Sequence, residues 1–576
     1  MCGLFGVAQN AALTELCINR ARAARDTLSH RGPDQAGEYC IGSTYMGHRR
    51  LSILDTSAAG RQPMVAGDVA VTVNGEIYNF LKLREELERV GYVFRSNSDS
   101  EVVLHGYHHW GIDGLVERMD GMYAAVIYDM SKRLLFAFRD RVGIKPFYYY
   151  LDDGHLVWGS ELKAIRTFLP AGALTLDPEA LLDFLVYRYI PAPKALYRNT
   201  FKLPAASILE CNLIDLSVRV RRYWQLHPKE ERGSRQGLEE RLLELLEESV
   251  CEQLVSDVPL GLLLSGGIDS SVIAAMAGRY QPHIRSFSIG FRQKGRDETP
   301  YARLMAAHAG TEHHERYLED EEMSGLFDRM HGWFDEPFGD TSAVPTHRVC
   351  GFAREQLKVA LSGDGGDELF GGYRWYPRYA SARSVGRWMP IKLREGIQFP
   401  ARMPRARELE LASISDPVWL YALIRGSVPY RRLQQWKERL GLPLDYDPLW
   451  AYRSSFRAEL PARKAAQVMD FHTYLPDDIL TKVDRVSMAV SLECRPPLLS
   501  RALVEFAFSL PEDFLYRDGG LKGGFKHALR AVLPSAVLEH RKQGFSVPDS
   551  GWRRALVSCY GSIQEGMLNH YLSNNG

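Results

Sequence analysis

One short stretch limits what this chain can fold into. It reads Gly261-Leu-Leu-Leu-Ser265-Gly-Gly-Ile-Asp269-Ser-Ser271, and an apolar segment follows it. An apolar run that breaks at two glycines and restarts predicts a buried strand, a tight turn and a helix N-terminus. Backbone N–H groups bind anions at such a place, because glycine has no Cβ to block the approach and the helix dipole is positive there. The stretch therefore predicts a phosphate-binding loop.

The carboxylate of Asp269 adds a requirement to this loop. A carboxylate repels phosphate unless a divalent cation lies between them, and Mg²⁺ is the usual cation. The lysine of the Gly-x4-Gly-Lys-Ser/Thr loop has no counterpart here. The loop resembles that of the ATP pyrophosphatases, which attack the α-phosphate of ATP, release pyrophosphate and leave an adenylylated substrate. An ordinary Gly-Ser turn after a buried strand is the alternative, since short motifs also arise by chance.

Length and composition restrict the class of protein. A chain of 576 residues is too long for one hydrophobic core, so we expect two or more domains. Lys+Arg and Asp+Glu number 71 each, so no overall field favours nucleic acid or an anionic membrane. The eight cysteines include no Cys-x-x-Cys pair, which argues against a zinc site or a disulfide framework. With no leader segment and no apolar run of about 20 residues, we expect a cytoplasmic enzyme without a membrane span.

The start of the chain, Met1-Cys2-Gly3, indicates a nucleophile. Removal of Met1 would leave a thiol and a free α-amine on Cys2. The amine has a reference pKa of about 8 and is partly neutral near pH 7, so one residue can serve as nucleophile and base. On this residue alone, a buried cysteine at the start of a strand is the favoured interpretation.

Polar residues at the ends of apolar runs support the nucleophile. Arg50 offers a guanidinium suited to bidentate carboxylate binding. Asn74 and Gly75 end an apolar run and provide an amide side chain and a backbone N–H, the parts of an oxyanion hole. Glu76 follows them, and Asp99 precedes a helix-like apolar segment.

Together with alternating segments at 122–128, 134–140 and 157–161, this order of motifs resembles the glutaminase domain of the class II glutamine amidotransferases. That resemblance implies an αββα sandwich of the N-terminal nucleophile hydrolase type, in which the cysteine hydrolyses glutamine to glutamate and ammonia. It implies Cys2 as the nucleophile, its own amine as the base, and an oxyanion hole of Asn74 and Gly75. The glutamine-binding residues that it implies are Arg50, Leu51, Ser52, Ile53, Leu54, Asn74, Gly75, Glu76 and Asp99. Arg50 is expected at the α-carboxylate, and the two acids at the α-ammonium.

The second half of the chain alternates strand-like and helix-like segments. Apolar runs end in glycine near residues 261, 290 and 363, with helical patterns between them. This alternation predicts a doubly wound parallel sheet, with further helices towards the C-terminus and ligands at the carboxyl ends of the strands. A charged stretch at 227–236 reads as a linker. We place the domain boundary near residue 215, giving domains 1–215 and 216–576.

A second glycine-rich element, Ser362-Gly363-Asp364-Gly-Gly-Asp367-Glu-Leu-Phe-Gly-Gly-Tyr, resembles a motif of the asparagine synthetase family. The resemblance implies Mg²⁺ at Asp269 and Asp367, and it implies that Asp364 assists formation and amination of an acyl-adenylate. It also implies an ATP site made of Leu264, Ser265, Gly266, Gly267, Asp269, Ser270, Ser271, Ile289, Ser362 and Gly363. Lys526 is expected to neutralise the departing pyrophosphate, although a solvated helix lysine is the alternative.

Three residues depart from the family pattern. Asp364 stands where glutamate is usual, and Leu498 and Ser500 replace phenylalanine and aspartate. A carboxylate that is one methylene shorter can change a rate if nothing compensates. These departures bear on the acceptor and leave the use of ATP and glutamine untouched.

We therefore predict ATP-consuming, glutamine-dependent amide synthesis through an acyl-adenylate, with aspartate as the expected acceptor and AMP, pyrophosphate and glutamate as the other products. The partners are small molecules and no nucleic acid, and a homodimer is left open. The alternatives are amidation of another carboxylate, such as a sugar uronate or a cell-wall or secondary-metabolite precursor, a glutaminase whose second domain is not synthetic, and a non-catalytic scaffold. Retention of Cys2, Asn74, Asp269 and Asp367 argues against the scaffold.

Overall fold

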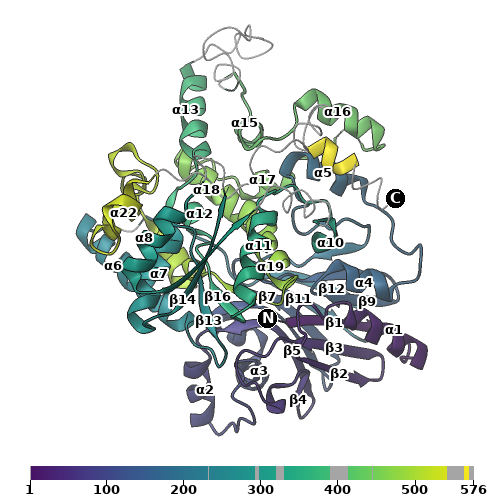
Figure 1. Ribbon diagram of the computed structural model, residues 1–576. Coiled ribbons are helices and arrows are strands. Elements are labelled where there is room, and N and C mark those ends of the chain that lie inside the picture. Colours follow the sequence, from purple (N-terminus) through teal and green to yellow (C-terminus); the bar gives the residue numbers. More distant parts are fainter. Residues whose placement is uncertain are drawn as a thin grey trace.

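The computed structural model describes residues 2–230, 233–291, 297–318, 330–388, 411, 413–443, 445–540 and 564–569. Figure 1 shows the antiparallel strands of the first two hundred residues, in purple and blue, beside a teal parallel sheet. Within the described ranges, no helix has the length and apolar character that a bilayer span requires.

The first sheet, sheet A, is antiparallel, with the strand order β10-β8-β9-β1-β3-β2. Its strands are β1 (Cys2–Gln9), β2 (Gln35–Ile41), β3 (Thr44–Arg50), β8 (Tyr148–Leu151), β9 (His155–Gly159) and β10 (Thr200–Lys202). β1 is an interior strand, paired with β3 and β9, and it is buried along almost its whole length. The ladder places Cys2 opposite Arg50.

The second sheet, sheet B, is also antiparallel, with the order β12-β11-β7-β6-β5-β4. Its strands are β4 (Met64–Ala66), β5 (Val69–Ile77), β6 (Gly121–Asp129), β7 (Leu134–Arg139), β11 (Ser207–Asn212) and β12 (Ser217–Arg222). The division at residue 215 remains a prediction. The ladder of sheet B continues beyond that point, because β12 pairs with β11 as far as Arg222.

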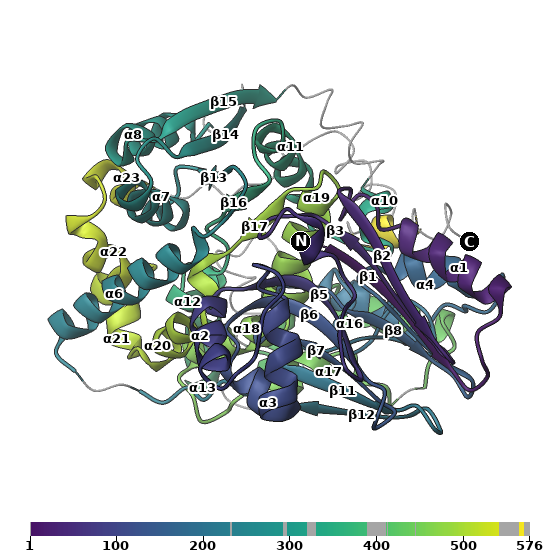
Figure 2. The same cartoon turned by 90° about the horizontal axis from the view of Figure 1, so that it is seen from below.

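The two sheets enclose one apolar core and carry helices on their outer faces. Apolar side chains of both sheets, such as Leu4, Met46 and Val126, pack together between them. Sheet A contacts α1 (Glu15–Asp26) and α4 (Leu162–Phe168), whereas sheet B contacts α3 (Glu101–Arg118), which packs on α2 (Phe80–Arg89). Figure 2 shows α2 and α3 on one side and α1 and α4 on the other. The αββα sandwich is confirmed; α5 (Pro178–Tyr187) follows it.

The third sheet is parallel, with the order β15-β14-β13-β16-β17. Its strands are β13 (Leu260–Leu263), β14 (Arg285–Phe291), β15 (Glu312–Leu318), β16 (Val359–Leu361) and β17 (Glu493–Arg495). Along the chain, β14 and β15 are added on one side of β13, and β16 and β17 are then added on its other side. That order is doubly wound, as predicted, and its switch point between β13 and β16 is where such sheets bind ligands.

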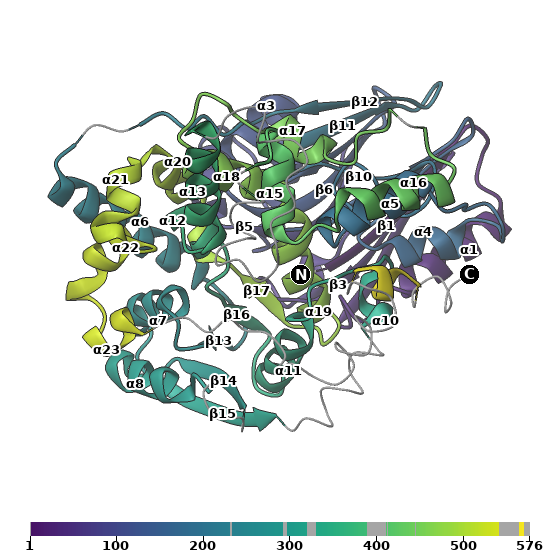
Figure 3. The same cartoon turned by 90° about the horizontal axis from the view of Figure 1, so that it is seen from above.

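Helices that contact this sheet or one another around it are α6 (Arg235–Gln253), α7 (Ile268–Tyr280), α8 (Thr299–Ala309), α11 (Ala343–Arg354) and α19 (Thr481–Met488). The later helices are α10 (His331–Phe334), α12 (Gly366–Phe370), α13 (Trp375–Trp388), α15 (Pro417–Arg425), α16 (Tyr430–Arg439), α17 (Trp450–Ser455), α18 (Ala462–His472), α20 (Arg501–Ser509), α21 (Glu512–Leu515), α22 (Gly523–Ala528) and α23 (Ser535–Glu539). One turn of π-helix, η3 (Leu475–Leu480), runs directly into α19. Figure 3 shows α13, α15, α17 and α18 grouped beside the N-terminal sheets.

Candidate active sites

Cys2 lies inside the sandwich, at the beginning of β1. Its side chain is buried, and its backbone N–H donates to Asn74 Oδ1 at 2.9 Å. Burial raises the pKa of the Cys2 thiol, whereas the Leu51 backbone N–H and the charge of Arg50 lower it. The thiol therefore needs a base before it can react as a thiolate. Removal of Met1 remains a prediction, because residue 1 lies outside the described part of the chain.

Asn74 and Gly75 stand beside this thiol, on the neighbouring sheet. Because Asn74 Oδ1 accepts from the Cys2 N–H, its Nδ2 must point elsewhere, and this buried donor meets no acceptor among the described residues. Gly75 has φ +152°, and a Cβ there would lie 1.9 Å from the Met122 carbonyl oxygen. Only glycine fits. A buried, unused amide donor next to a thiol is what an oxyanion hole requires.

Arg50 forms the cationic side of the pocket. Its Nη2 donates to the Leu54 and Asp55 carbonyl oxygens at 2.9 and 2.7 Å, and its Nη1 donates to Gln35 Oε1 and the Ser57 carbonyl oxygen at 3.2 Å each. All four acceptors are neutral, so the guanidinium is held in place without losing its charge to a described carboxylate. The adjoining residues 51–54 are buried as well. A fixed, uncompensated guanidinium is suited to binding a carboxylate.

Two acids form the opposite side. Burial raises the pKa of Glu76 well above its usual value, and the carboxylates of Glu493 and Asp99 raise it further. Asp99 accepts from the Ile77 N–H at 2.7 Å, and burial raises its pKa too. The cation nearest Glu76 is Arg495, with Nη2 3.5 Å from Oε2. The pocket thus has an excess of acid where the ammonium of glutamine was expected.

Sequence reasoning missed Arg495 and Glu493, which belong to the parallel sheet. Arg495 Nε donates to Glu493 Oε1 at 2.7 Å, and its Nη1 donates to the carbonyl oxygens of Gln253 and Val255 at 2.8 and 2.7 Å. The Arg495 carbonyl oxygen accepts from the Ser362 N–H at 2.9 Å. One residue therefore contacts the glutamine pocket with its side chain and the predicted ATP site with its backbone. The only signal was a Glu-x-Arg alternation at 493–495.

A cluster of buried charges, which we call the ionic bridge, also joins the two parts. It consists of Arg31, Glu161, Asp335, Asp484 and Arg485. Arg31 donates to the Cys2 carbonyl oxygen at 3.0 Å, to Glu161 at 2.9 Å, and to both oxygens of Asp484 at 2.8 and 3.0 Å. Arg485 donates to Asp335 at 2.6 Å. The bridge thus fixes helix α19 against the strand that carries Cys2.

The predicted phosphate loop connects β13 to α7, as expected. Gly267 is the N-cap of α7, and Gly266 has φ +83°, where a Cβ would lie 2.8 Å from the Ala302 nitrogen. The hydroxyls of Ser265 and Ser270 lie 3.0 Å apart, and the Ser265 Oγ accepts from the Gly267 N–H. The loop is therefore prefolded by its own hydroxyls.

The remaining predicted ATP residues surround this loop. Leu264 and Ile289 are buried at the ends of β13 and β14, and the buried Ser271 lies on α7. A Cβ on Gly363 would lie 2.7 Å from the Ser270 nitrogen, so the second glycine-rich element packs against the beginning of α7. Ser362 Oγ donates to Asp364 Oδ2 at 2.7 Å. The two predicted elements meet at the switch point of the sheet.

Asp269 and Asp367 converge on one cation, the ammonium of Lys522. Lys522 Nζ lies 2.6 Å from both oxygens of Asp269 and 2.7 Å from Asp367 Oδ1. The lysine is buried and its backbone has φ +56°. A Cβ on Gly372 would lie 2.0 Å from Asp367 Oδ1 and 2.3 Å from Lys522 Cε, so this glycine makes room for the contact.

These acids fit Mg²⁺, which prefers carboxylate oxygens and keeps water or phosphate as its other ligands. In the described ranges, no group of three or more His, Cys, Asp or Glu side chains forms a metal cage. Two carboxylates that already share one cation are consistent with a Mg²⁺ site whose remaining ligands come from the substrate phosphates. Asp269 and Asp367 would hold it.

Lys526 lies one helical turn beyond Lys522, on α22, where it is partly buried. Burial and the charge of Lys522 lower its pKa. Lys522 is therefore the lysine in contact with the two acids, and it escaped sequence reasoning. Its sequence signal is a lysine directly before Gly523-Gly524.

An N-terminal sandwich with a buried cysteine, joined to a doubly wound sheet with a glycine-rich loop, defines an enzyme of the glutamine-dependent, ATP-driven amide ligase class. Residues 1–224 match the family model for the glutamine amidotransferase domain, and residues 241–565 match the model for asparagine synthase. The chain belongs to the asparagine synthase family. The predicted resemblance and enzyme class are confirmed.

Named relatives cover nearly the whole chain. Asparagine synthetase (glutamine-hydrolyzing) 1 of Bacillus subtilis is 30% identical over 596 residues, covering 99% of this chain and 91% of that protein. A Methanocaldococcus jannaschii protein, provisionally named asparagine synthetase (glutamine-hydrolyzing) 2, is 33% identical over 531 residues, covering 85% of this chain and 98% of its own. A third, asparagine synthetase (glutamine-hydrolyzing) 3 of B. subtilis, is 29% identical over 546 residues, covering 90% and 83%.

The contacts of Lys522 predict a metal-linked stability effect. In Lys522→Met, Asp269 and Asp367 lose their shared cation, and breaking a buried ion pair costs about 3 kcal/mol. We expect a lower melting temperature without Mg²⁺ and a larger Mg²⁺-induced rise than in the wild type. Lys526→Met, one turn away, is the control and should behave like the wild type. Equal Mg²⁺ responses in the two variants would contradict the assignment of Lys522 to the acids.

Proposed function

We propose that the chain converts aspartate to asparagine, using glutamine as the nitrogen source and ATP as the energy source. The observation that carries this proposal is the double contact of Arg495, which joins a glutamine-type pocket to a nucleotide-type pocket through one buried residue. Two independent enzymes would have no need of such a contact. The names of the relatives support aspartate as the acceptor.

In the N-terminal site, the roles follow from the placement of charges. Cys2 Sγ attacks the side-chain carbonyl carbon of glutamine, after its α-amine accepts the thiol proton. Asn74 Nδ2 and the Gly75 N–H stabilise the oxyanion, while Arg50 holds the α-carboxylate and Glu76 and Asp99 hold the α-ammonium. The α-ammonium then gives its proton to the amide nitrogen, the C–N bond breaks and ammonia leaves; water hydrolyses the thioester, which releases glutamate and restores the thiol.

In the second site, an acceptor carboxylate oxygen attacks the α-phosphorus of ATP and pyrophosphate leaves, forming an acyl-adenylate. The glycine-rich loop at 264–271, with Ile289, Ser362 and Gly363, would bind the nucleotide, and Lys526 and Lys522 would face the departing pyrophosphate. Mg²⁺ held by Asp269 and Asp367 would neutralise phosphate charge. Ammonia then attacks the acyl carbon and AMP leaves. Asp364 assists both steps.

The two half-reactions require a closed path between the pockets. Ammonium is not a nucleophile, so ammonia must travel unprotonated from Cys2 to the acyl-adenylate. We propose that it passes between the ionic bridge and β17, the elements that already connect the sites. A domain division near residue 215, a cytoplasmic location and a homodimer belong to the same proposal and rest on sequence reasoning alone.

The acceptor is proposed to bind beside Asp364, where charges of both signs meet. Lys482 Nζ donates to Asp340 Oδ2 at 3.0 Å and to Ser342 Oγ at 2.9 Å. Burial opposes the charge of Lys482, but the carboxylates of Asp340, Asp478 and Asp364 raise its pKa above the usual value. A permanently charged lysine among acids suits an acceptor that is itself an amino acid.

One observation favours a second acceptor class. Leu498 is fully buried, and its Cδ1 lies 2.9 Å from where a Cβ on Gly366 would stand. An apolar side chain thus lines the second glycine-rich element at one of the positions that depart from the family pattern. A larger carboxylate, such as a sugar uronate or a cell-wall precursor, is the rival acceptor.

Pyrophosphate release with a panel of carboxylates tests the acceptor. With glutamine and Mg-ATP present, we expect pyrophosphate to be released faster with aspartate than with every other carboxylate, because the charges around Lys482 and Asp364 suit an amino acid. When glutamine is labelled at its amide nitrogen, the label should appear in the amide product. Faster release with a uronate than with aspartate would transfer the assignment to the rival class, and glutamate production without any pyrophosphate would reduce the protein to a glutaminase.

Cys2→Ala should separate the two sites. Loss of the nucleophile is expected to lower glutamine-dependent synthesis by about 10³-fold or more, while synthesis from free ammonia continues. Cys17→Ala, a partly buried cysteine outside the pocket, is the control and should keep both activities. Product analysis with glutamine and then with an ammonium salt measures the difference. Loss of both activities in Cys2→Ala would argue against separate sites.

Asp269→Asn should have the complementary effect. Without this carboxylate the phosphates lose a charge partner, so pyrophosphate release should fall by about 100-fold or more. Glutamine hydrolysis should persist, because Asp269 has no contact with the sandwich. Asp513→Asn, which changes an exposed acid, is the control. Normal pyrophosphate release in Asp269→Asn would remove this residue from the nucleotide site.

A further inference from the structure

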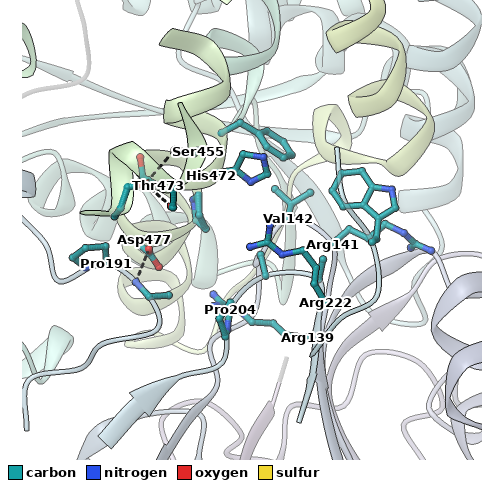
Figure 4. Close-up of a pocket in the computed structure, with 18 of the residues that line it drawn as sticks. Arg139, Arg141, Val142, Pro191, Pro204, Arg222, Ser455, His472, Thr473 and Asp477 are labelled. Atoms are coloured by element: carbon teal, nitrogen blue, oxygen red, sulfur yellow. Dashed lines mark hydrogen bonds between the residues drawn. The ribbon is translucent and has the colours of Figure 1, made fainter. Parts of the chain in front are cut away.

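A cavity of about 150 Å³ lies where the two parts of the molecule meet, and its lining includes none of the residues named above for the two active sites; we call it the junction cavity (Figure 4). Its walls come from three regions. The sandwich contributes Arg139 and Arg141, the end of β12 contributes Arg222, and the α17–α18 region contributes Arg457 and His472. Figure 4 shows Arg139, Arg141, Arg222 and His472 around the same space.

The lining is strongly cationic. Four guanidinium groups stand against one carboxylate, that of Asp477, among the described residues that line the cavity. Asp477 already accepts from the Ala192 N–H at 2.9 Å. The balance of four positive charges and one negative charge leaves an excess of three. Arg139 and Arg141 are buried and Arg457 is partly buried, whereas Arg222 is exposed at the edge of the cavity.

Arg222, at the end of β12, and Arg457, between α17 and α18, have no acidic partner in the described part of the chain. The Arg222 side chain makes no hydrogen bond or ion pair there, and Arg457 Nη1 donates only to the neutral carbonyl oxygens of Ser454 and Phe456, at 3.2 Å each. Burial, together with the charges of Arg222 and Arg457, lowers the pKa of His472 to about 3. The imidazole therefore stays neutral and can donate one N–H to a ligand.

The other two arginines are fixed in place. Arg139 donates to the carbonyl oxygens of Lys145, Leu203 and Gly143 at 2.6, 2.8 and 2.7 Å. Arg141 donates to three carbonyl oxygens near the end of α3, and its buried Nε meets no described acceptor. Neutral acceptors orient these guanidinium groups without removing their charge. The cavity thus has a rigid cationic wall and one free arginine at its edge.

We propose that the junction cavity binds a small phosphate-type dianion, independently of the two active sites. Its volume matches that of a cavity that holds benzene, which admits phosphate or pyrophosphate and excludes a nucleotide. Guanidinium groups form strong, charge-assisted hydrogen bonds with such oxyanions.

The position of the cavity gives the bound anion a structural effect. Arg457 precedes α18 and His472 ends it, and α18 contacts η3, which runs directly into α19, the helix that carries Asp484 of the ionic bridge. On the other side the walls belong to the sandwich. An anion between them would attract both sides at once and stabilise the junction.

The test measures binding of inorganic phosphate to the full chain whose nucleotide site is filled with a non-hydrolysable ATP analogue and Mg²⁺. Calorimetry and melting temperature are followed at constant ionic strength, with chloride as the reference anion. We expect saturable binding and a rise in melting temperature for the wild type. In Arg222→Gln/Arg457→Gln the dissociation constant should increase about tenfold or more. Arg219→Gln, which removes the same charge from the same strand outside the cavity, should bind like the wild type.

The outcomes are decisive in either direction. Binding that is lost in the double variant and kept in Arg219→Gln supports the proposal. No saturable effect beyond chloride, equal loss in Arg219→Gln, or disappearance when the ATP analogue is present overturns it. Tighter binding of succinate than of phosphate overturns the phosphate-type assignment. If the double variant fails to fold, the single change Arg222→Gln at the exposed edge replaces it, with the same expectation of weaker binding.

Discussion

The ionic bridge is the interaction on which the rest of the molecule depends. Arg31 is fully buried, and the carboxylates that it contacts come from both parts of the chain. Charges without water are tolerated only when they are paired, and removing one partner costs about 3–5 kcal/mol. The pairing therefore permits one relative position of α19 and β1. Since β1 begins with Cys2, the nucleophile is positioned by the second half of the chain as well as by its own sheet.

The same principle explains why the glutamine pocket is incomplete within the sandwich. Its acids, Glu76 and Asp99, are buried and repel each other, and in the described part of the chain the cation that contacts Glu76 comes from outside the sandwich. Arg495 provides the missing charge from β17, while its backbone accepts from Ser362. The two pockets thus share a structural element. Arg495 is thus in contact with both pockets at once.

Local features of both sites could be predicted from the sequence, because they depend on neighbours along the chain. Gly75 and Gly266 mark positions where the backbone admits no side chain, and the strand patterns around them are regular. Lys522 and Arg495 could not be predicted in this way. Their partners are hundreds of residues distant, and Lys522 stands outside α22 in a left-handed conformation that no periodicity indicates. The predicted boundary near residue 215 also falls before β12, although β12 pairs with β11 of sheet B.

The shared strand β17 makes the molecule indivisible. A sandwich produced alone would contain the thiol, the amide donor and the binding acids, yet it would lack the arginine that compensates those acids. A separate second half would expose that arginine and the carboxylates of α19 to water. Grafting this glutaminase onto another synthetase would therefore require transplanting a piece of the original partner with it. The two regions are separate in the sequence, but in the folded chain each depends on charges that the other provides.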